Sequence, residues 1–176
     1  MPPVRHMVMA MAVLVVPVLV ISWWFTRIPE PPITAVDWQG AASQARAAAV
    51  FPVWTPRNLP DSWIAVRARW TPKGEPGIDG RPVVGNTWQL GFLGPDRRYL
   101  GVDQRDQARE QLVDKVTRQS SADGSSSVLQ REWQRRVSRD GRTRSLVLED
   151  DGSVVVVSGD VPYAQLEAFA ATLGTD

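Results

Sequence analysis

The chain has 176 residues, with 20 Lys or Arg against 19 Asp or Glu and a formal net charge of +1. It contains no cysteine, which excludes disulfides, thiol nucleophiles and cysteine-ligated zinc. A nearly neutral protein has no general attraction for nucleic acid or for anionic lipid. We therefore predict no nucleic-acid partner, no metal and no cofactor.

An uncharged apolar run over residues 7–25 (MVMAMAVLVVPVLVISWWF) predicts a transmembrane anchor helix. About 19 residues at about 1.5 Å each span about 28 Å, close to the ~30 Å hydrocarbon thickness of a bilayer. The run ends in Trp23, Trp24 and Phe25, whereas a cleaved signal peptide ends in small residues. We therefore favour a retained anchor, with Trp23 and Trp24 at the membrane–water interface.

The charges that flank this run predict its orientation. Arg5 precedes the run, and Arg27 follows it together with the acidic Glu30 and Asp37. Because the cytoplasmic flank of a membrane helix carries the excess of Lys and Arg, we expect residues 1–6 to form a short cytoplasmic segment and the rest of the chain to lie outside the cytoplasm. Arg5 and Arg27 would then lie at the two membrane interfaces.

The chain after the anchor predicts a tether followed by one domain. Residues 26–36 are rich in proline, which favours an extended tether. Residues 37–176 are sufficient for one extracytoplasmic domain with its own core. Most charged residues of the chain lie in this domain, and their signs balance.

Within the domain, hydrophobic periodicity predicts three helices and six strands. Asp37 is placed to cap the first helix, Pro162 stands in the first turn of the last helix, and Gly174 is expected to end it. The expected helices cover 38–50, 106–118 and 161–173, and the expected strands cover 64–70, 87–93, 99–104, 132–139, 143–149 and 153–159.

Turn signals connect these elements. Gly94-Pro95-Asp96 is expected to join two strands of a hairpin, and Asp140-Gly141 and Asp151-Gly152 are typical of two-residue hairpin turns. Residues 51–60 contain three prolines and are expected to be irregular, and residues 119–127 (QSSADGSSS) are expected to be a flexible polar loop. The order helix, three strands, helix, three strands, helix predicts an α+β domain with a mainly antiparallel sheet of about six strands.

Catalytic motifs are scarce in this sequence. It has no phosphate-binding glycine loop, no HExxH motif and no G-x-S-x-G motif. The single histidine, His6, precedes the anchor, so the domain lacks the usual activated nucleophiles. We therefore predict no catalytic residues. Asp and Glu are plentiful, which leaves a carboxylate-dependent cell-wall hydrolase as an alternative.

Tryptophan and arginine supply the candidate binding residues. Exposed tryptophans can bind sugars or fill pockets of a partner, although we expect most of the six in the domain to pack in the core. Six arginines lie on one predicted hairpin, where alternation places Arg135 and Arg139 with Trp133 on one face and Arg136 on the other. Together with Trp63, these four residues form the possible binding surface. The alternative is a solvated face balanced by nearby Asp and Glu.

Two segments resemble an actinobacterial membrane-anchored family, domain of unknown function 4245. They are residues 51–70 (FPVWTPRNLPDSWIAVRARW) and residues 154–173 (VVVVSGDVPYAQLEAFAATL). The family has Gly after the Leu-Pro pair, where this sequence has Asp61. The resemblance implies a membrane-anchored envelope protein with no assigned activity. A looser likeness to periplasmic sensor and lipoprotein-sorting domains is one of fold alone.

These observations favour a non-enzymatic, extracytoplasmic module that is anchored in the membrane and binds an envelope protein or a glycan. A second alternative, besides the hydrolase, is a sensor or accessory subunit whose anchor helix pairs with another transmembrane helix. The anchor has no G-x-x-x-G motif, and Ala10 and Ala12 lie near one end of it.

Overall fold

The computed structural model describes residues 4–25 and 34–175 and divides the chain into two compact units, Met1–Ile33 and Thr34–Asp176. The expected interface residue Arg27 and residues 26–33 of the expected tether lie outside the described residues. In the described part of the chain, the first unit holds one helix and the second holds all of the strands.

Helix α1 (Val4–Phe25) has the length and composition of a membrane span. Its 22 residues measure about 33 Å, and the window Val8–Phe25 has a mean hydropathy of 2.4. Arg5 is exposed in the first turn, and Trp23 and Trp24 are exposed in the last. A signal sequence near an N-terminus shares these properties, so retention of the helix stays a prediction.

The second unit is built on one antiparallel sheet of seven strands in the order β2-β3-β4-β8-β7-β6-β5. Its strands are β2 (Ile64–Thr71), β3 (Thr87–Leu93), β4 (Tyr99–Arg105), β5 (Ser121–Val128), β6 (Arg131–Val137), β7 (Arg144–Asp150) and β8 (Ser153–Gly159). The helices are α2 (Trp38–Ala48), α3 (Arg109–Val116) and α4 (Tyr163–Ala170), and β1 (Trp54–Pro56) pairs with β9 (Leu173–Thr175). The predicted α+β class is confirmed.

Predictions about the start of a helix and about a hairpin turn are confirmed. The carboxylate of Asp37 accepts hydrogen bonds from the backbone N–H groups of Gln39 and Gly40, each at 3.1 Å, and so caps α2. Asp151 and Gly152 form the two-residue turn between β7 and β8, and both have positive φ. Pro162, expected in the first turn of the last helix, instead directly precedes α4 as its N-cap.

The expected loop over residues 119–127 is wrong in its main part, because β5 is a strand at the edge of the sheet. It pairs with β6 and carries a register shift between Ala122 and Ser125, where Gly124 has a φ of +88°. Most of its side chains are exposed, and only Ser126 and Val128 are buried. An edge strand that buries so little needs no alternation of apolar residues, which is why the sequence indicates a loop.

Two further predictions at chain reversals are wrong. Asp140-Gly141 lies within a four-residue loop, because Ser138 and Thr143 are the residues that pair before it. Gly174 does not end the last helix: α4 ends at Ala170, and Gly174 belongs to β9. A side chain at Gly174 would overlap the guanidinium of Arg57, so the glycine permits close packing of β9 beside that arginine.

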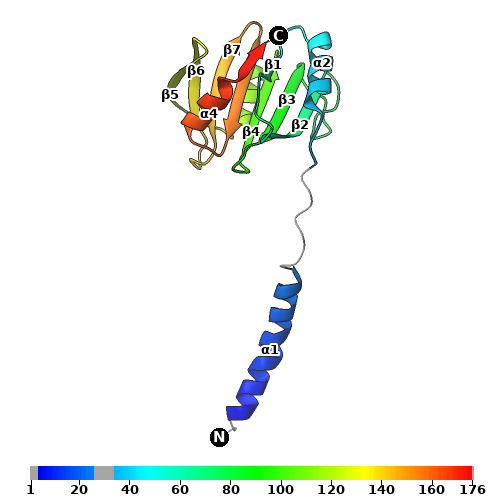
Figure 1. The fold of residues 1–176 in the computed structure, drawn as a ribbon, viewed down its shortest axis with the longest axis vertical. Helices are drawn as coiled ribbons and strands as arrows, with labels where there is room; N and C mark the ends of the chain where they lie inside the picture. Colours follow the sequence, from blue (N-terminus) through cyan, green and yellow to red (C-terminus); the bar gives the residue numbers. More distant parts are fainter. Residues whose placement is uncertain (1–3, 26–33, 176) are drawn as a thin grey trace. The chain divides into compact units, whose positions relative to one another are not determined.

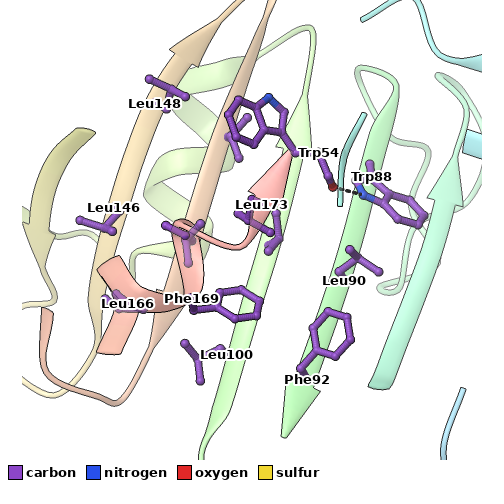
Figure 2. Close-up of a cluster of buried hydrophobic side chains, with 14 of the residues drawn as sticks. Trp54, Trp88, Leu90, Phe92, Leu100, Leu146, Leu148, Leu166, Phe169 and Leu173 are labelled. Atoms are coloured by element: carbon purple, nitrogen blue, oxygen red, sulfur yellow. Dashed lines mark hydrogen bonds between the residues drawn. The ribbon is translucent and has the colours of Figure 1, made fainter. Parts of the chain in front are cut away.

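The main core lies between the sheet and the layer formed by α2, α4 and the β1–β9 pair. Figure 1 looks onto this layer, with α4 in front of the sheet. Figure 2 shows Leu166 and Phe169 of α4 among side chains that point from the strands, such as Leu90 and Phe92 of β3. The side chain of Trp88 is fully buried, and its Nε1 donates a 3.0 Å hydrogen bond to the carbonyl of Trp54.

The opposite face of the sheet is covered only in part. Helix α3 packs Leu112 and Val113 onto Val147 of β7 and onto Val154 and Val156 of β8. Strand β8 therefore has covered residues on both faces, as its continuous valine run requires. The outer surface of β2, β3 and β4 carries polar residues instead and forms the floor of a groove.

Candidate binding groove

The groove has a volume of about 1040 Å³ and lies between the loop that joins β2 to β3 and helix α3. Its floor is the polar face of three neighbouring strands, with Arg67, Thr87, Gln89, Tyr99, Asp103 and Arg105 among the lining residues. Its walls include Ile78 and Val84 from the loop and Lys115 from α3. The volume is that of a small-ligand or peptide cleft.

The centre of the floor is an ion pair held by an amide. The guanidinium of Arg67 donates to both carboxylate oxygens of Asp103, at 3.1 and 3.2 Å, and the amide of Gln89 donates to Asp103 at 2.7 Å. Asp103 is buried, with 3% of its surface exposed, whereas the side chain of Arg67 is 30% exposed. The Asp103 carboxylate is thus satisfied by its neighbours, and Arg67 keeps one side toward the groove.

Tyr99 lies across a pair of glycines at one end of the floor. Gly91 and Gly101 face each other across β3 and β4, and a Cβ on Gly91 would lie 2.6 Å from Cε2 of Tyr99. The guanidinium carbon of Arg67 is 5.8 Å from the centre of the Tyr99 ring. Burial raises the pKa of the Tyr99 phenol. The two glycines therefore allow an aromatic ring to lie flat on the sheet.

Arg105 lies at the other end of β4. It is half-buried, and its Nε donates a 2.9 Å hydrogen bond to the hydroxyl of Thr87, its partner on β3. Burial lowers the pKa of Arg105, while the carboxylates of Asp103 and Asp106 oppose that shift. The guanidinium remains charged at any physiological pH, so an anion placed beside it would offset its incomplete hydration.

Hydrogen bonds fasten the wall formed by the β2–β3 loop. The side chain of Asn86 accepts from the backbone of Lys73 at 3.0 Å and donates to Asp106 at 2.7 Å. The guanidinium of Arg69 donates to the carbonyl of Pro76 at 2.6 Å. At the tip of the loop, a backbone hydrogen bond from Arg81 and a side-chain contact from Lys115 of α3 lower the pKa of Asp79. Both walls of the groove are thereby joined through one exposed pair, 3.2 Å apart.

Each carboxylate that lines the groove has a polar partner. Asp103 is bound to Arg67, Asp79 to Lys115, and Asp160 accepts a 2.6 Å hydrogen bond from Thr143. Within the described residues, no group of three or more His, Cys, Asp or Glu is arranged to hold a metal ion.

The two tryptophans of the predicted binding surface pack against other aromatic rings. Trp133 is fully buried and meets Trp54 edge-on, with ring centres 5.9 Å apart. Trp63 is half-buried and stacks on Phe169 of α4, with ring centres 5.2 Å apart. Trp133 thus offers no surface to a ligand, whereas Trp63 keeps a partly exposed edge.

The three arginines of that surface lie in different places. Arg135 faces α4, where its guanidinium contacts Ser126 and Glu167 at 2.5 Å and lies 4.8 Å from the ring centre of Tyr163. Arg136 donates to Ser120, its Nε to the hydroxyl at 2.8 Å and its Nη2 to the carbonyl at 2.9 Å.

Arg139 lies in the loop after β6, so its expected place on the face of Trp133 is wrong. The structure therefore does not bring the predicted arginine surface together.

Sequence reasoning missed the groove, although one signal for it was present. Strand β2 alternates polar and apolar residues, and β3 and β4 carry the polar residues Gln89, Asp103 and Arg105 on the same face of the sheet. Such alternation indicates an uncovered sheet face. The walls are formed by residues distant in sequence, and nothing local predicts that they meet.

The fold and the groove define an α+β domain with one open, charged sheet face, in a chain that also carries a candidate membrane-spanning helix. The chain belongs to the family described as protein of unknown function (DUF4245), whose model matches residues 2–173. The predicted resemblance is confirmed. A search of curated proteins finds no match.

Several solved structures are similar to part of this chain, and two of them contain MucB. One is the MucA/MucB complex of Pseudomonas aeruginosa, with 17% identity and a TM-score of 0.40 over 72% of this chain and 36% of that chain. The other is MucB in complex with MucA(peri), with 16% identity and a TM-score of 0.38 over 70% of this chain and 37% of that chain. This chain thus matches little more than a third of the length of those chains.

Proposed function

We propose that this protein is a membrane-anchored module that lies outside the cytoplasm and binds an envelope protein in its groove. The observation that carries the proposal is the groove of about 1040 Å³, in which two walls flank the open face of β2, β3 and β4. Charged side chains on this face are fixed by hydrogen bonds, which reduces the entropy lost when a partner binds. Helix α1 supports the anchoring part of the proposal, since it is long and apolar enough to cross a bilayer.

A protein partner fits the groove better than a glycan. Ile78 and Val84 expose 63% and 52% of their surfaces on the wall, where aliphatic side chains of a partner would contact them. Sugars are bound by exposed aromatic faces. Of the tryptophans in the domain, Trp54, Trp88 and Trp133 are buried, and Trp38, Trp63 and Trp70 pack against the core. In the groove, Tyr99 is the aromatic residue that a sugar could contact, and Arg67 lies over its ring.

A hydrolase is disfavoured by the state of the carboxylates. A glycosidase needs one carboxylic acid with a raised pKa and a second carboxylate facing it. The pKa of Asp79 is lowered rather than raised, and Asp103 is occupied by Arg67 and Gln89.

Cross-linking in cells tests this function with a matched pair of variants. Val84→Glu places an anion on the exposed groove wall, and Val50→Glu places one at a residue that is 78% exposed and does not line the groove. After mild cross-linking and purification of the full chain, we expect one protein to be recovered with the wild type and with Val50→Glu but lost with Val84→Glu. Recovery of that protein with Val84→Glu, or of no protein with the wild type, would refute the proposal.

The anchor is tested separately. The full chain should sediment with membranes, and its mature mass should include residues 7–25. A reporter enzyme that is active only outside the cytoplasm, fused after Asp176, should be active. A mature protein that begins after Phe25, or an inactive but stable fusion, would contradict this part.

A further inference from the structure

The groove concentrates positive charge on a domain that is otherwise neutral. Residues 34–176 contain 18 Lys or Arg and 18 Asp or Glu. The groove is lined by six of these cations and three of these carboxylates, which gives it a net formal charge of +3. The cations are Arg67, Arg81, Arg98, Arg105, Lys115 and Arg118, and the carboxylates are Asp79, Asp103 and Asp160. A cleft lined mainly by one sign of charge selects a partner of the opposite sign.

Three of these cations have no carboxylate of their own. Among the described residues, Arg67 pairs with Asp103 and Lys115 pairs with Asp79, whereas Arg81, Arg105 and Arg118 form no salt bridge. Arg98 lies 3.8 Å from the carboxylate of Asp96 and donates a 2.8 Å hydrogen bond to the backbone carbonyl of Asp160. The cations without a salt bridge therefore lie on the loop wall, at the end of β4 and just after α3.

The length and the walls of the groove indicate the form of the partner. Strand β4 runs along the floor for seven residues, about 23 Å at about 3.3 Å per residue. Exposed aliphatic side chains from the loop line one wall, as described above. A ligand that fits both features is an extended segment in which acidic and aliphatic side chains alternate.

We infer that the groove binds an extended acidic segment of a protein, with Arg105 and Arg118 contacting its carboxylates and Val84 its aliphatic side chains. This inference rests on the proposed function and narrows the partner to one class. Arg105 is the main contact because it is half-buried on the floor and, among the described residues, hydrogen-bonds to the hydroxyl of Thr87 without forming a salt bridge.

Peptide binding to the full chain tests the inference. The chain is placed in nanodiscs of zwitterionic lipid, and fluorescence anisotropy is measured with labelled peptides of about eight residues that alternate Leu with Glu, Gln or Lys. We expect the Glu peptide to bind at least about tenfold more tightly than the Gln peptide, the Lys peptide to bind most weakly, and the affinity for Glu to fall as salt is raised. Equal affinity for the Glu and Gln peptides would overturn the inference.

Variants and a competitor complete the test. Arg105→Gln combined with Arg118→Gln should weaken binding of the Glu peptide about tenfold or more. The control Arg46→Gln alters an exposed cation on α2 that does not line the groove, and should change the affinity by less than about twofold. Thermal unfolding of each variant shows whether it is folded.

An acidic oligosaccharide of equal charge is the competitor. If it displaces the peptide as well as unlabelled Glu peptide does, the protein class of partner is wrong. Suppose that no peptide binds, but that cross-linking in cells still recovers a protein that is lost with Val84→Glu. The proposed function then stands, and only the inference that the partner segment is acidic is wrong. If both fail, the proposed function fails.

Discussion

The two halves of the sheet differ in how many of their faces are covered. Strands β7 and β8 lie between α4 on one side and α3 on the other, and residues 154–157 of β8 are all fully buried. Strands β2 and β3 are covered on one face only, α3 borders β4 on the other face, and the three strands present Arg67, Gln89 and Asp103 there. The comparison shows that the side chains of β7 and β8 contribute mainly to the stability of the core. Strands β2, β3 and β4 also present an ordered polar face that a partner can contact.

The largest effect on stability is expected in the half that is covered on both faces. Leu146→Ala removes a fully buried side chain from β7 and should lower the free energy of unfolding by about 2–5 kcal/mol. Val84→Ala, on the exposed groove wall, should change it by less than about 0.5 kcal/mol. Denaturant unfolding of the full chain in detergent measures both. Similar losses for the two variants would contradict the distinction between the halves.

A smaller loss of stability is expected in the floor of the groove. Asp103→Ala leaves Arg67 and Gln89 without their shared acceptor and should cost about 1–3 kcal/mol. The second variant, Gln89→Ala, removes one donor to a carboxylate that Arg67 still contacts, and should cost less. A greater loss from Gln89→Ala would show that the amide, rather than the ion pair, holds the floor together.

A loss of about 1 kcal/mol in the free energy of unfolding is expected when the packing of Tyr99 against Gly91 is disturbed. Gly91→Ala places a Cβ against the Tyr99 ring, so the ring must shift, at a cost of about 1 kcal/mol. In a chain that already carries Tyr99→Ala, the same substitution should cost almost nothing. A double-mutant cycle measures this coupling. An equal cost in both backgrounds would mean that backbone strain at Gly91, and not the tyrosine, is responsible.

The smallest effect is expected from a partly exposed ion pair on the α4 side. Hydrogen bonds from Ser126 and Arg135 lower the pKa of Glu167 below its ordinary 4.5. The stability that this carboxylate contributes is therefore present above pH 4.5 and is lost as the pH falls through the lowered pKa. Because the pair is partly exposed, Glu167→Gln should cost less than about 1 kcal/mol at pH 7, and progressively less as the pH falls below 4.5. A cost that stays constant from pH 7 to pH 3 would contradict this origin.

The same contrast decides how much of the fold could be predicted from the sequence. Val154–Val157 is a continuous apolar run that indicates a doubly covered strand, and Asp37 and Asp151-Gly152 are local signals that the structure bears out. Strand β5 could not be predicted, because an exposed edge strand held by backbone pairing has no apolar pattern. Elements that have a local sequence pattern, such as a capping residue or an apolar run, can be predicted from the sequence. An element such as β5, which is held by pairing with another strand, cannot.

The groove was less predictable than the fold for a related reason. Lys115 and Asp79 join its walls although 36 residues separate them in the sequence, and Arg105 is significant only because its partner on β3 is Thr87. The arginine-rich hairpin was a more visible feature of the sequence, yet its charges are divided between the two faces and a turn. Density of charge along the chain did not predict density of charge on the surface.

Photo-cross-linking from single positions is the most direct test of the central claim that the singly covered half of the sheet binds the partner. A photoreactive amino acid is placed in the full chain in cells, either at Val84 on the groove wall or at Leu129, which is 47% exposed in the turn between β5 and β6. We expect one protein to be cross-linked from position 84 and not from position 129, and Arg105→Gln with Arg118→Gln should abolish that product. Cross-linking of the partner from position 129 but not from position 84 would contradict the account.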